Sequence, residues 1–482
     1  MTFTQMTRFS LRLCLITILL LSVGTRDVSA KDNQDTYNYS YWGEAVPAPP
    51  AYLPTLLINS EQLETEPLKT PNDLYVSDNR YVYIADSGNN RIVILDDAFQ
   101  FADTIEGFIY NQKEETFLNP QGVFVTKDNH IYIADTGNQR VVHLDEARDL
   151  VKIIEKPDSE LLADNFSFRP QKVVADEAGR VFVMVEGVFD GFMEFSIDGY
   201  FTTFIGANRV QVDPLEYLWR RFATQEQRSQ MVMFIPTEFT GLDIDDDGFL
   251  YATNADDSDD MIKKINARGD DILRREGFFN PVGDILYTTE KGPSRLSDIT
   301  VAESGIYSVL DQRRGRIFTY NGDGHLMYVF GSTGNRLGQF QTPVAIEQYD
   351  DFFLVLDRDL GEITVFEVTN YGATLNHAVK QYDQGDEVGA FDSFKEVVKM
   401  NTNLEFAYTG IGKALLRQDD FKQAMYQFKQ SLDQQNYSKA YLLYRNKTLR
   451  EHFTTIMTVI ILTIVIILGI KFYIKSKRKR VS

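Results

Sequence analysis

The chain is poor in the residues that cross-link proteins or carry metal and acid-base chemistry. Its 482 residues include one cysteine, five histidines and two tryptophans. A single cysteine excludes an internal disulfide, so stability has to come from buried cores. The histidines are separated along the chain, and we expect them to be too scattered in the fold to form a metal cluster. No nucleophile elbow, phosphate-binding loop or paired-histidine zinc motif occurs in the sequence.

Positive charge is also scarce. The chain has 49 lysines and arginines against 69 acidic residues, a net charge of -20. Several basic residues are gathered at residues 471–480, so the rest of the chain is more acidic still. Because nucleic acids bind to basic surfaces, this composition disfavours them as partners.

A long internal repeat dominates the sequence. Residues 84–92 (IADSGNNRI) return 49 residues later at residues 133–141 (IADTGNQRV). Both copies follow a proline-containing lead-in and a hairpin of β-branched and aromatic residues. A period of this length corresponds to four short strands, which is typical of a β-propeller blade. Weaker copies of the lead-in extend the series to six units.

An aspartate and an arginine five residues apart recur in the units. The pairs are Asp86 and Arg91, Asp135 and Arg140, and Asp311 and Arg316, while the sixth unit has Glu362 in the arginine position. Since aspartate accepts hydrogen bonds from turn amides, we interpret the motif as a structural turn rather than a binding site. An arginine at the end of such a turn can bridge neighbouring blades by charge-assisted bonds to carbonyls or carboxylates. Gly88 and Gly137 are expected to adopt backbone conformations that a β-carbon would penalise.

These units resemble the NHL repeat family over about residues 68–368. The resemblance implies a mainly β fold, a six-bladed β-propeller. Known NHL propellers include RNA binders, protein-interaction modules, lactonase-like enzymes and a lyase of peptide amidation, so the family does not choose a function. Lactonase-like propellers hold one divalent ion at the central channel through carboxylates and an asparagine.

Two features complete the propeller region. The sixth unit offers three strands, and we expect the apolar residues 52–58 to be its missing outer strand, since closure removes the exposed edge. An insertion at residues 208–236 contains a predicted helix with Trp219, Arg220 and Arg221. This insertion is either part of a binding face or a packing flap, and the two interpretations are equally supported.

Candidate binding residues are those at which the units depart from the repeat. They are Trp219, Arg220, Arg221, Asp256, Asp257 and Glu362. The two aspartates lie in an acidic run at residues 254–260, which more often is a solvated turn than a ligand set. We identify no catalytic residue.

Residues 243–248 copy the first half of a calcium-binding loop. Asn254 stands where the loop needs a bidentate glutamate, and the stretch coincides with the hairpin turn of the other units. We therefore expect no cofactor and no metal, with calcium as the less favoured alternative.

The N-terminal region predicts export. Arg8 and Arg12 precede an apolar run and small residues follow at 28–30, so residues 1–30 have the pattern of a signal peptide. An exported protein of this size without disulfides is more typical of bacteria. Residues 31–67 form an aromatic segment that ends in the closing strand. Its aromatic residues either stack on sugar rings or, as we favour, pack across the propeller rim.

Beyond the propeller the pattern becomes helical. Two similar stretches lie 34 residues apart and contain small and aromatic residues at packing positions, namely Ala390, Phe394, Gly412, Ala424 and Phe428. Residues 373–450 therefore resemble tetratricopeptide (TPR) repeats, with Asp419 in place of the usual turn glycine. Two repeats are fewer than the three usually needed, so residues 439–445 are expected to cap them. The array is either a rigid stalk, which we favour, or a groove for a partner peptide.

The last apolar run, residues 453–474, is long enough to cross a membrane, since about 20 residues span a bilayer. The basic residues 475–482 follow it, and positive charge stays on the cytoplasmic side. We expect a single-pass type I membrane protein with the propeller and helices outside the cell.

Two functions fit these features. The first is a non-enzymatic, membrane-anchored extracellular binding or scaffold protein whose propeller binds a glycan, a cell-wall fragment or a protein. The alternative is a cell-surface, metal-dependent hydrolase of the lactonase (gluconolactonase) type. The lack of assembled catalytic motifs favours the first.

Overall fold

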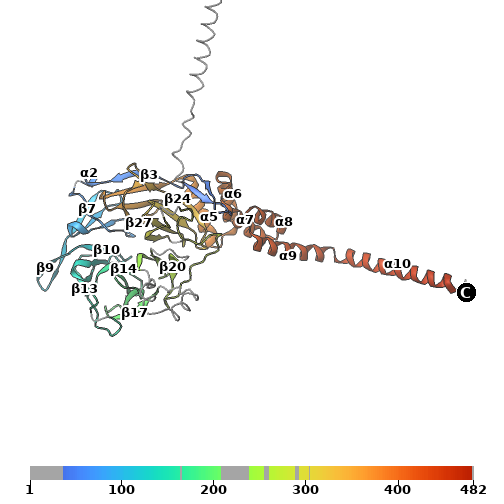
Figure 1. The fold of residues 1–482 in the computed structure, drawn as a ribbon, viewed down its shortest axis with the longest axis horizontal. Helices are drawn as coiled ribbons and strands as arrows, with labels where there is room; N and C mark the ends of the chain where they lie inside the picture. The colour runs from blue at the N-terminus through green and yellow to red at the C-terminus, as the bar shows by residue number, and fades with distance from the viewer. Residues whose placement is uncertain are drawn as a thin grey trace, which may run out of the picture.

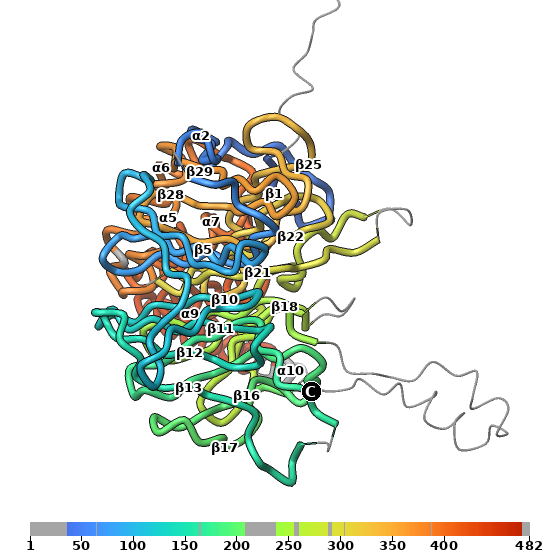
Figure 2. Tube along the Cα trace, turned by 90° about the vertical axis from the view of Figure 1, so that its left-hand side faces the viewer, coloured from blue at the N-terminus to red at the C-terminus, as the bar shows by residue number. Residues whose placement is uncertain are grey.

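The structure is a computed structural model that describes residues 36–63, 65–162, 165–207, 238–254, 260–287, 292–302 and 304–479. The expected signal peptide and the insertion at residues 208–236 lie outside the described residues. Within them the chain forms a six-bladed propeller, a group of helices against one side of it, and one long helix that points away (Figure 1). Seen from the propeller end, that helix lies behind the blades (Figure 2).

The blades are antiparallel sheets arranged around a central axis. Blade 1 consists of β4 (Asp73–Val76), β5 (Val82–Asp86), β6 (Arg91–Leu95) and β7 (Phe101–Ile105). Blade 2 consists of β10 (Pro120–Val125), β11 (Ile131–Asp135), β12 (Arg140–Leu144) and β13 (Leu150–Ile154). Blade 3 consists of β14 (Pro170–Ala175), β15 (Val181–Val185), β16 (Phe192–Phe195) and β17 (Phe201–Ile205). Blade 4 consists of β18 (Phe239–Ile244), β19 (Leu250–Asn254) and β20 (Ile262–Ile265). Blade 5 consists of β21 (Leu296–Val301), β22 (Tyr307–Asp311), β23 (Arg316–Tyr320) and β24 (Leu326–Phe330). Blade 6 consists of β27 (Pro343–Tyr349), β28 (Phe352–Asp357), β29 (Glu362–Val368) and β3 (Tyr52–Ile58).

The inner strands contact one another in sequence around the ring, and β27 contacts β4 to close it. Their side chains alternate between the two faces of each sheet, so the apolar ones fill the spaces between blades. Shorter elements decorate this frame: β1 (Tyr37–Tyr39), β2 (Ala45–Pro47), α2 (Ser60–Leu63), β8 (Gly107–Tyr110), β9 (Lys113–Thr116), β25 (Ser332–Thr333) and β26 (Gln339–Phe340).

The sixth blade is completed from the N-terminal side of the chain. Strand β3 pairs antiparallel with β29, in a register that places Tyr52 opposite Val368 and Ile58 opposite Ile363. The pairing expected for residues 52–58 is therefore present. It covers the edge that β29 would otherwise expose, which is how propellers avoid edge-to-edge association.

The aspartate of the repeated turn fixes the turn to the segment that enters the same blade. Asp86 accepts hydrogen bonds from the amide of Lys69 and from Nε of Arg91, both at 2.7 Å. Arg91 also donates to the carbonyl of Glu66 at 2.9 Å. Arg91 thus pairs with its own turn and with the segment that leads into the same blade, and these two bonds do not reach a strand of a neighbouring blade. The hydroxyl of Ser87 makes the bridge instead, donating to the carbonyl of Pro120 in the next blade at 2.5 Å.

The glycine of the turn is required by close packing and not by its backbone angles. A β-carbon on Gly88 would lie 2.6 Å from the carbonyl oxygen of Lys69, and one on Gly137 would lie 2.4 Å from that of Leu118. The left-handed residue is Asn90, at φ 56°, as is its equivalent in the second blade. The conformational role expected for the two glycines is therefore wrong.

The fifth blade keeps the residues of the motif but not their pairing. Asp311 pairs with Arg314 at 3.1 Å, while Arg316 donates to the hydroxyl of Tyr37 at 2.9 Å and lies 3.5 Å from Asp284. Arg316 thereby attaches the N-terminal segment to the propeller. In the second blade the expected pair is present, with Arg140 2.8 Å from Asp135.

Six helices follow the propeller. They are α5 (Asn370–Asp383), α6 (Glu387–Met400), α7 (Glu405–Arg417), α8 (Phe421–Gln430), α9 (Gln434–Glu451) and α10 (Phe453–Lys479). Aspartates cap α6, α8 and α9, each accepting from the amide three residues on. At the turn between α7 and α8, Asp419 adopts a left-handed φ of 59°, where the equivalent turn has Gly385 at 78°.

Neighbouring helices approach closely at glycines. A β-carbon on Gly410 would lie 2.6 Å from the ring of Phe394, and one on Gly412 would lie 2.6 Å from the ring of Phe428. Ala390 and Ala424 are buried beside these rings. The five residues expected to pack the helices are therefore all interior, with Gly410 as a further contact that the sequence pattern did not single out.

The helices and the propeller share one hydrophobic core. It runs from Phe330 and Phe353 in blades 5 and 6 to Leu375 and the later helices. At the junction Asn376 donates to the hydroxyl of Tyr52 at 3.1 Å and accepts from that of Tyr328 at 3.0 Å. Because these polar groups are paired inside the core, the helices are held in one orientation on the propeller.

The β1–β2 hairpin lies over this junction. Asn38 donates to the carbonyl of Met327 in blade 5 and accepts from Asn401 between α6 and α7, at 3.0 and 3.1 Å. Tyr37 is buried under Arg316, whose guanidinium carbon lies 5.0 Å from the ring centroid. Most of the aromatic segment therefore packs against the rim, as favoured from the sequence, while Trp42 is 78% exposed.

The long helix α10 contains an apolar stretch, Phe453–Ile474, of 22 residues and none of it is buried in the protein. Its length and composition suit a membrane span.

Candidate functional site

The axis of the propeller is lined by one equivalent position from each inner strand. The six residues are Asp73, Gly122, Lys172, Gly241, Asp298 and Ala345. Long and small side chains thus alternate around the ring. A β-carbon on Gly122 would lie 2.5 Å from the carbonyl of Gln171, and one on Gly241 would lie 2.8 Å from Cα of Asp298. The small residues let the inner strands approach, and the three charged residues fill the centre.

Lys172 joins three blades across the axis. Its Nζ lies 2.8 Å from Asp73 and 2.7 Å from Asp298, and all three side chains are buried or nearly so. Each aspartate also accepts an amide hydrogen bond from the next blade, Asp73 from Val123 at 3.1 Å and Asp298 from Ile346 at 3.0 Å. The triad therefore ties blades 1, 3 and 5 to one another and to blades 2 and 6.

The charges of the triad are shifted by burial. Burial raises the pKa of Asp73 and raises that of Asp298 to about 6, although Lys172 acts in the opposite sense. Burial acts to lower the pKa of Lys172, but the charges of Asp298 and Asp73 hold it above its usual value. Burial outweighs the attraction of the shared ammonium, and the charge of Asp73 adds to it at Asp298, so both aspartates are harder to ionise than in water.

A second acidic pair lies one layer further along the axis. Asp243 accepts from the amide of Val301 at 2.8 Å, and Thr300 donates to Glu347 at 3.3 Å. Burial raises the pKa of Asp243 to about 7 and that of Glu347 well above its usual value, with the charge of Asp243 adding to the second effect. The centre therefore holds four carboxyl groups, three buried and one half-buried, for one ammonium, and the charge of this cluster depends on pH.

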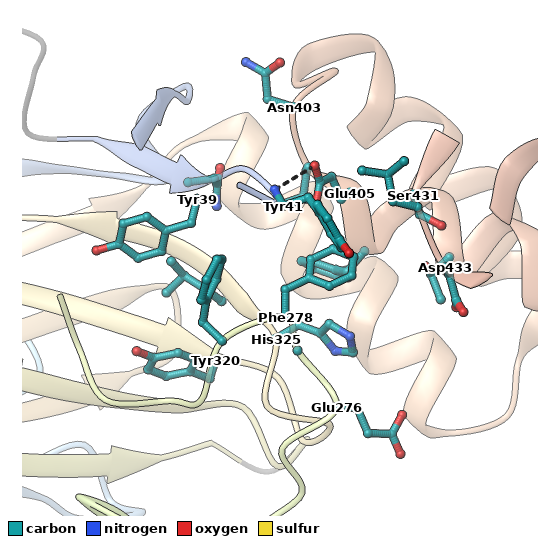
Figure 3. A pocket seen from close by; sticks show the side chains of 18 of the residues that line it. Tyr39, Tyr41, Glu276, Phe278, Tyr320, His325, Asn403, Glu405, Ser431 and Asp433 are labelled. Carbon is teal, nitrogen blue, oxygen red and sulfur yellow. Dashed lines mark hydrogen bonds between the residues drawn. The ribbon is translucent and has the colours of Figure 1, made fainter. Parts of the chain in front are cut away.

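A large cavity lies elsewhere, at the junction between blade 5 and the helices. It has a volume of about 660 Å³ and is walled by the N-terminal hairpin, residues 276–285, the turn between β23 and β24, the start of α7 and the turn before α9. We call it the junction pocket. Tyr41, Phe278 and His325 lie together between the propeller strands and the helices (Figure 3).

Aromatic rings form one wall of the junction pocket. The rings of Tyr41 and Phe278 meet edge to face, with centroids 4.9 Å apart, and His325 lies 5.6 Å from the ring of Phe406 on α7. The ring of Trp42 lies 5.0 Å from that of Tyr41, which lines the pocket. These residues come from parts of the chain more than 360 positions apart, from Tyr41 to Phe406, and only the docking of the helices brings them together.

Two buried polar atoms in the pocket lining have no hydrogen-bond partner. They are Oε2 of Glu405 and Nδ1 of His325. The other carboxylate oxygen of Glu405 accepts from the amide of Tyr41 at 3.2 Å (Figure 3). Burial raises the pKa of Glu405 and lowers that of His325 to about 4, so the imidazole is neutral at physiological pH. An unpartnered buried polar atom is destabilising by about 1 to 3 kcal/mol, which a ligand group can recover.

Of the candidate binding residues chosen from the sequence, Glu362 is the one within the described part of the chain. Trp219, Arg220, Arg221, Asp256 and Asp257 lie outside the described residues. Glu362 begins β29 opposite Asp357, and its pKa is raised first by burial and then by that aspartate. It lies in blade 6 and is not among the residues that line the junction pocket.

The stretch that resembles half a calcium loop is a hairpin turn between β18 and β19. Asp245 accepts from the amides of Asp247 and Phe249 at 3.1 and 2.9 Å, and Lys264 lies 3.1 Å from its other oxygen. Gly248 has the positive φ of 79° that closes such turns. The oxygens of Asp245 are thus already paired within the blade.

Two of the histidines are neighbours, contrary to the expectation that all five would be scattered. Nδ1 of His130 lies 2.8 Å from Nε2 of His143, whose ring stacks on Tyr132. The register of β11 and β12 sets Tyr132 opposite His143, and the hairpin turn adds His130 beside them. Among the described residues, no group of three potential ligands surrounds the pair or any other position.

The sequence patterns did not identify the charged residues on the propeller axis or the residues that line the junction pocket. Lys172 and Asp298 occupy the same position of their repeats, so alignment of the six lead-ins would have shown charged residues in alternate blades. The junction pocket left no comparable signal, because Tyr41, Phe278 and Glu405 are distant in sequence and belong to three different elements.

Comparisons with known proteins agree with the propeller. Residues 117–144 match the NHL repeat. No curated protein matches the chain by sequence.

Solved structures with similar folds include enzymes. Selenomethionine-substituted virginiamycin B lyase from Staphylococcus aureus is 10% identical, with a TM-score of 0.39 over 65% of this chain and 99% of that one. A streptogramin B lyase is 11% identical, with a TM-score of 0.41 over 67% and 100%. A protein of unknown function from Bacteroides thetaiotaomicron VPI-5482 is 13% identical, with a TM-score of 0.41 over 69% and 75%. At these values the likeness carries no information about function. The chain is thus a six-bladed β-propeller that contains an NHL repeat in its second blade, followed by a helical region.

Proposed function

We propose that this protein is a membrane-anchored binding protein that holds its propeller outside the cell at the end of a rigid helical stalk. The supporting observation is the single core shared by blades 5 and 6 and the helices, which continue through α9 into α10. A partner bound anywhere on the propeller would thereby be held at a fixed height and orientation above the lipid.

The centre of the propeller supports binding rather than catalysis. In the lactonase-like alternative, axial carboxylates hold a divalent ion. Here the ammonium of Lys172 lies between Asp73 and Asp298 and satisfies their charge. A cation at that place would have to displace a lysine from two buried ion pairs, which costs several kcal/mol. We therefore propose that a glycan, a cell-wall fragment or a protein partner binds to the exposed surface of the propeller.

The helical array is proposed to be two TPR-like repeats capped by α9. Its small and aromatic contacts, Gly412 against Phe428 and Gly410 against Phe394, are the supporting observations. So short an array with its first helix fused to a propeller serves better as a stalk than as a peptide groove.

Full-length protein in lipid nanodiscs would be screened against glycans, cell-wall fragments and solubilised surface proteins, with lactone hydrolysis measured in parallel. Saturable binding without metal-dependent hydrolysis is the expected result. Hydrolysis that requires a divalent ion and is lost on Asp298→Asn would favour the alternative.

The membrane topology has its own test, because the chain has no cysteine beyond Cys14. Single cysteines would be introduced as Trp42→Cys and Ser482→Cys and treated with a membrane-impermeant maleimide. We expect labelling of the first in intact cells and of the second only after permeabilisation. The reverse pattern would contradict the proposed orientation.

A further inference from the structure

We propose that the junction pocket is a binding site for an organic cation, an alkylammonium or guanidinium group inserted between its aromatic rings and Glu405. The proposal does not depend on the propeller's partner. It rests on the shape, the charge and the unpartnered groups of the pocket.

The charge of the described lining is negative. Three carboxylates, Glu276, Glu405 and Asp433, face one basic side chain, Lys413. Lys413 already donates to the hydroxyl of Tyr382 at 3.0 Å, on its own side of the junction. The imidazole of His325 is neutral and adds no positive charge. A cationic ligand would therefore be attracted, whereas an anion would be repelled.

The walls suit the body of such a ligand. Tyr41, Phe278 and Phe406 present aromatic rings, and a cation over an aromatic ring gains about 0.5 to 2 kcal/mol depending on its desolvation. The volume of about 660 Å³ lies in the range of small-molecule sites. The cavity can thus hold the alkyl chain as well as the charged head group.

Glu405 gives the site its specificity. Its Oε1 is held by the amide of Tyr41, while Oε2 is buried without a partner, so a small rotation of the carboxyl group exposes an acceptor to the cavity. A bound ammonium or guanidinium would donate to this oxygen and favour the ionised form of a carboxyl whose pKa burial has raised. A neutral ligand of the same shape can donate only an uncharged hydrogen bond to this oxygen, which is weaker than the charge-assisted bond of a cation.

Trp42 provides the readout. It is one of two tryptophans, is 78% exposed, and its ring contacts that of Tyr41, a residue of the pocket lining. In full-length Trp219→Phe protein in non-ionic detergent, Trp42 fluorescence would be titrated at constant ionic strength with butylammonium, butylguanidinium, neutral 1-pentanol and anionic pentanoate. We expect saturable changes with the two cations, and binding weaker by about tenfold or more for the alcohol and the anion.

Variants separate the contributions. Glu405→Gln keeps the acceptor for Tyr41 but removes the charge, and is expected to weaken cation binding about tenfold while leaving alcohol binding unchanged. Phe278→Leu, at an exposed ring, is expected to weaken it several-fold. Glu396→Gln is the control, because Glu396 is an exposed carboxylate paired with Lys399 on α6.

A second set of titrations distinguishes the source of the cation. Gly-Lys-Gly and Gly-norleucine-Gly, both with blocked ends, would be compared with free butylammonium. Preference for the lysine peptide over free amine would assign the site to a basic side chain of a protein, and the opposite preference to a small amine. Equal binding of cations and alcohol, equal affinity in Glu405→Gln, or no saturable response to any probe would overturn the proposal. These outcomes are independent of the glycan and protein screen.

Discussion

Lys172 reaches across the propeller axis to Asp298, two blades away in the ring, with 2.7 Å between Nζ and Oδ1. The ion pair is buried, and the same ammonium also binds Asp73 at 2.8 Å. Each inner strand packs mainly against its two neighbours in the ring, and this ion pair directly links two blades that are not neighbours. These ion pairs hold blades 1, 3 and 5 together at the propeller axis.

Replacing Lys172→Met should therefore be strongly destabilising. It leaves two buried carboxylates without their counter-ion, a loss of about 3 to 5 kcal/mol. Thermal unfolding of the full-length protein, followed by circular dichroism, would show a lower midpoint. Lys127→Met is the matched control, because Lys127 also bridges two carboxylates, Glu177 and Asp246 at 2.8 Å, but is 51% exposed. Its effect should stay below about 1 kcal/mol, and equal effects of the two changes would contradict a special role for burial.

The second acidic layer predicts a dependence of stability on pH. The folded pKa of Asp243 is raised to about 7, above the value in the unfolded chain, so the folded state retains a proton that the unfolded state has lost. Stability is then greatest at acidic pH, and decreases as the pH rises from about 4 through 7. Asp243→Asn removes the free-energy cost of ionising this buried carboxyl group, and should stabilise the protein at pH 8 by roughly 2 to 4 kcal/mol.

Denaturant unfolding between pH 4 and 8 checks this expectation. The slope of stability against pH should be shallower in Asp243→Asn than in the wild type. Asp247→Asn, in the exposed turn of the same blade, should leave the slope unchanged. A variant as pH-sensitive as the wild type would show that Asp243 does not carry the proton.

The turn glycines offer a test of close packing. Gly88→Ala would set a β-carbon 2.6 Å from the carbonyl oxygen of Lys69, and the strand or turn must shift to admit it. We expect a loss of about 1 to 3 kcal/mol in thermal unfolding. Gly322→Ala serves as control, because its β-carbon would lie 3.7 Å from the nearest atom and its φ is not positive. If Gly88→Ala were as harmless, the close approach would not be what requires glycine.

The shared core predicts that helices and propeller unfold together. Helical signal at 222 nm and the near-ultraviolet signal of the buried tyrosines should change at the same temperature. Asn376→Leu, which removes the hydrogen bonds to Tyr52 and Tyr328, should lower that midpoint by an amount equivalent to about 1 to 3 kcal/mol. Two separate transitions in the wild type would contradict the rigid junction.

Local patterns predicted the fold well where each blade repeats the same physics. The 49-residue period and the alternation of its strands are enough to expect blades, and the unpaired apolar stretch at Tyr52–Ile58 is enough to expect the closing strand. The packing residues of the helical repeats were identified for the same reason, because Ala390 and Phe394 recur as Ala424 and Phe428 at a spacing of 34 residues.

Side-chain partners were harder to predict because they depend on register and on contacts between elements far apart. Arg91 and Arg316 occupy the same motif position, yet one binds its own turn and the other binds Tyr37, since the N-terminal hairpin packs against blade 5. The junction pocket is still harder to predict from the sequence, because it forms only where the helices pack against the propeller. No periodicity in one chain records that docking.

The closing strand has a consequence for the order of synthesis. β3 ends at Ile58 and its partner β29 begins at Glu362, about 300 residues later. At translation rates of about 5 to 20 residues per second, the strand waits roughly 15 to 60 seconds for its partner. The ring therefore closes only when the stalk and the apolar helix are next to be made. The apolar helix begins about 85 residues after β29 ends, so it is made roughly 4 to 17 seconds after the strand that closes the ring.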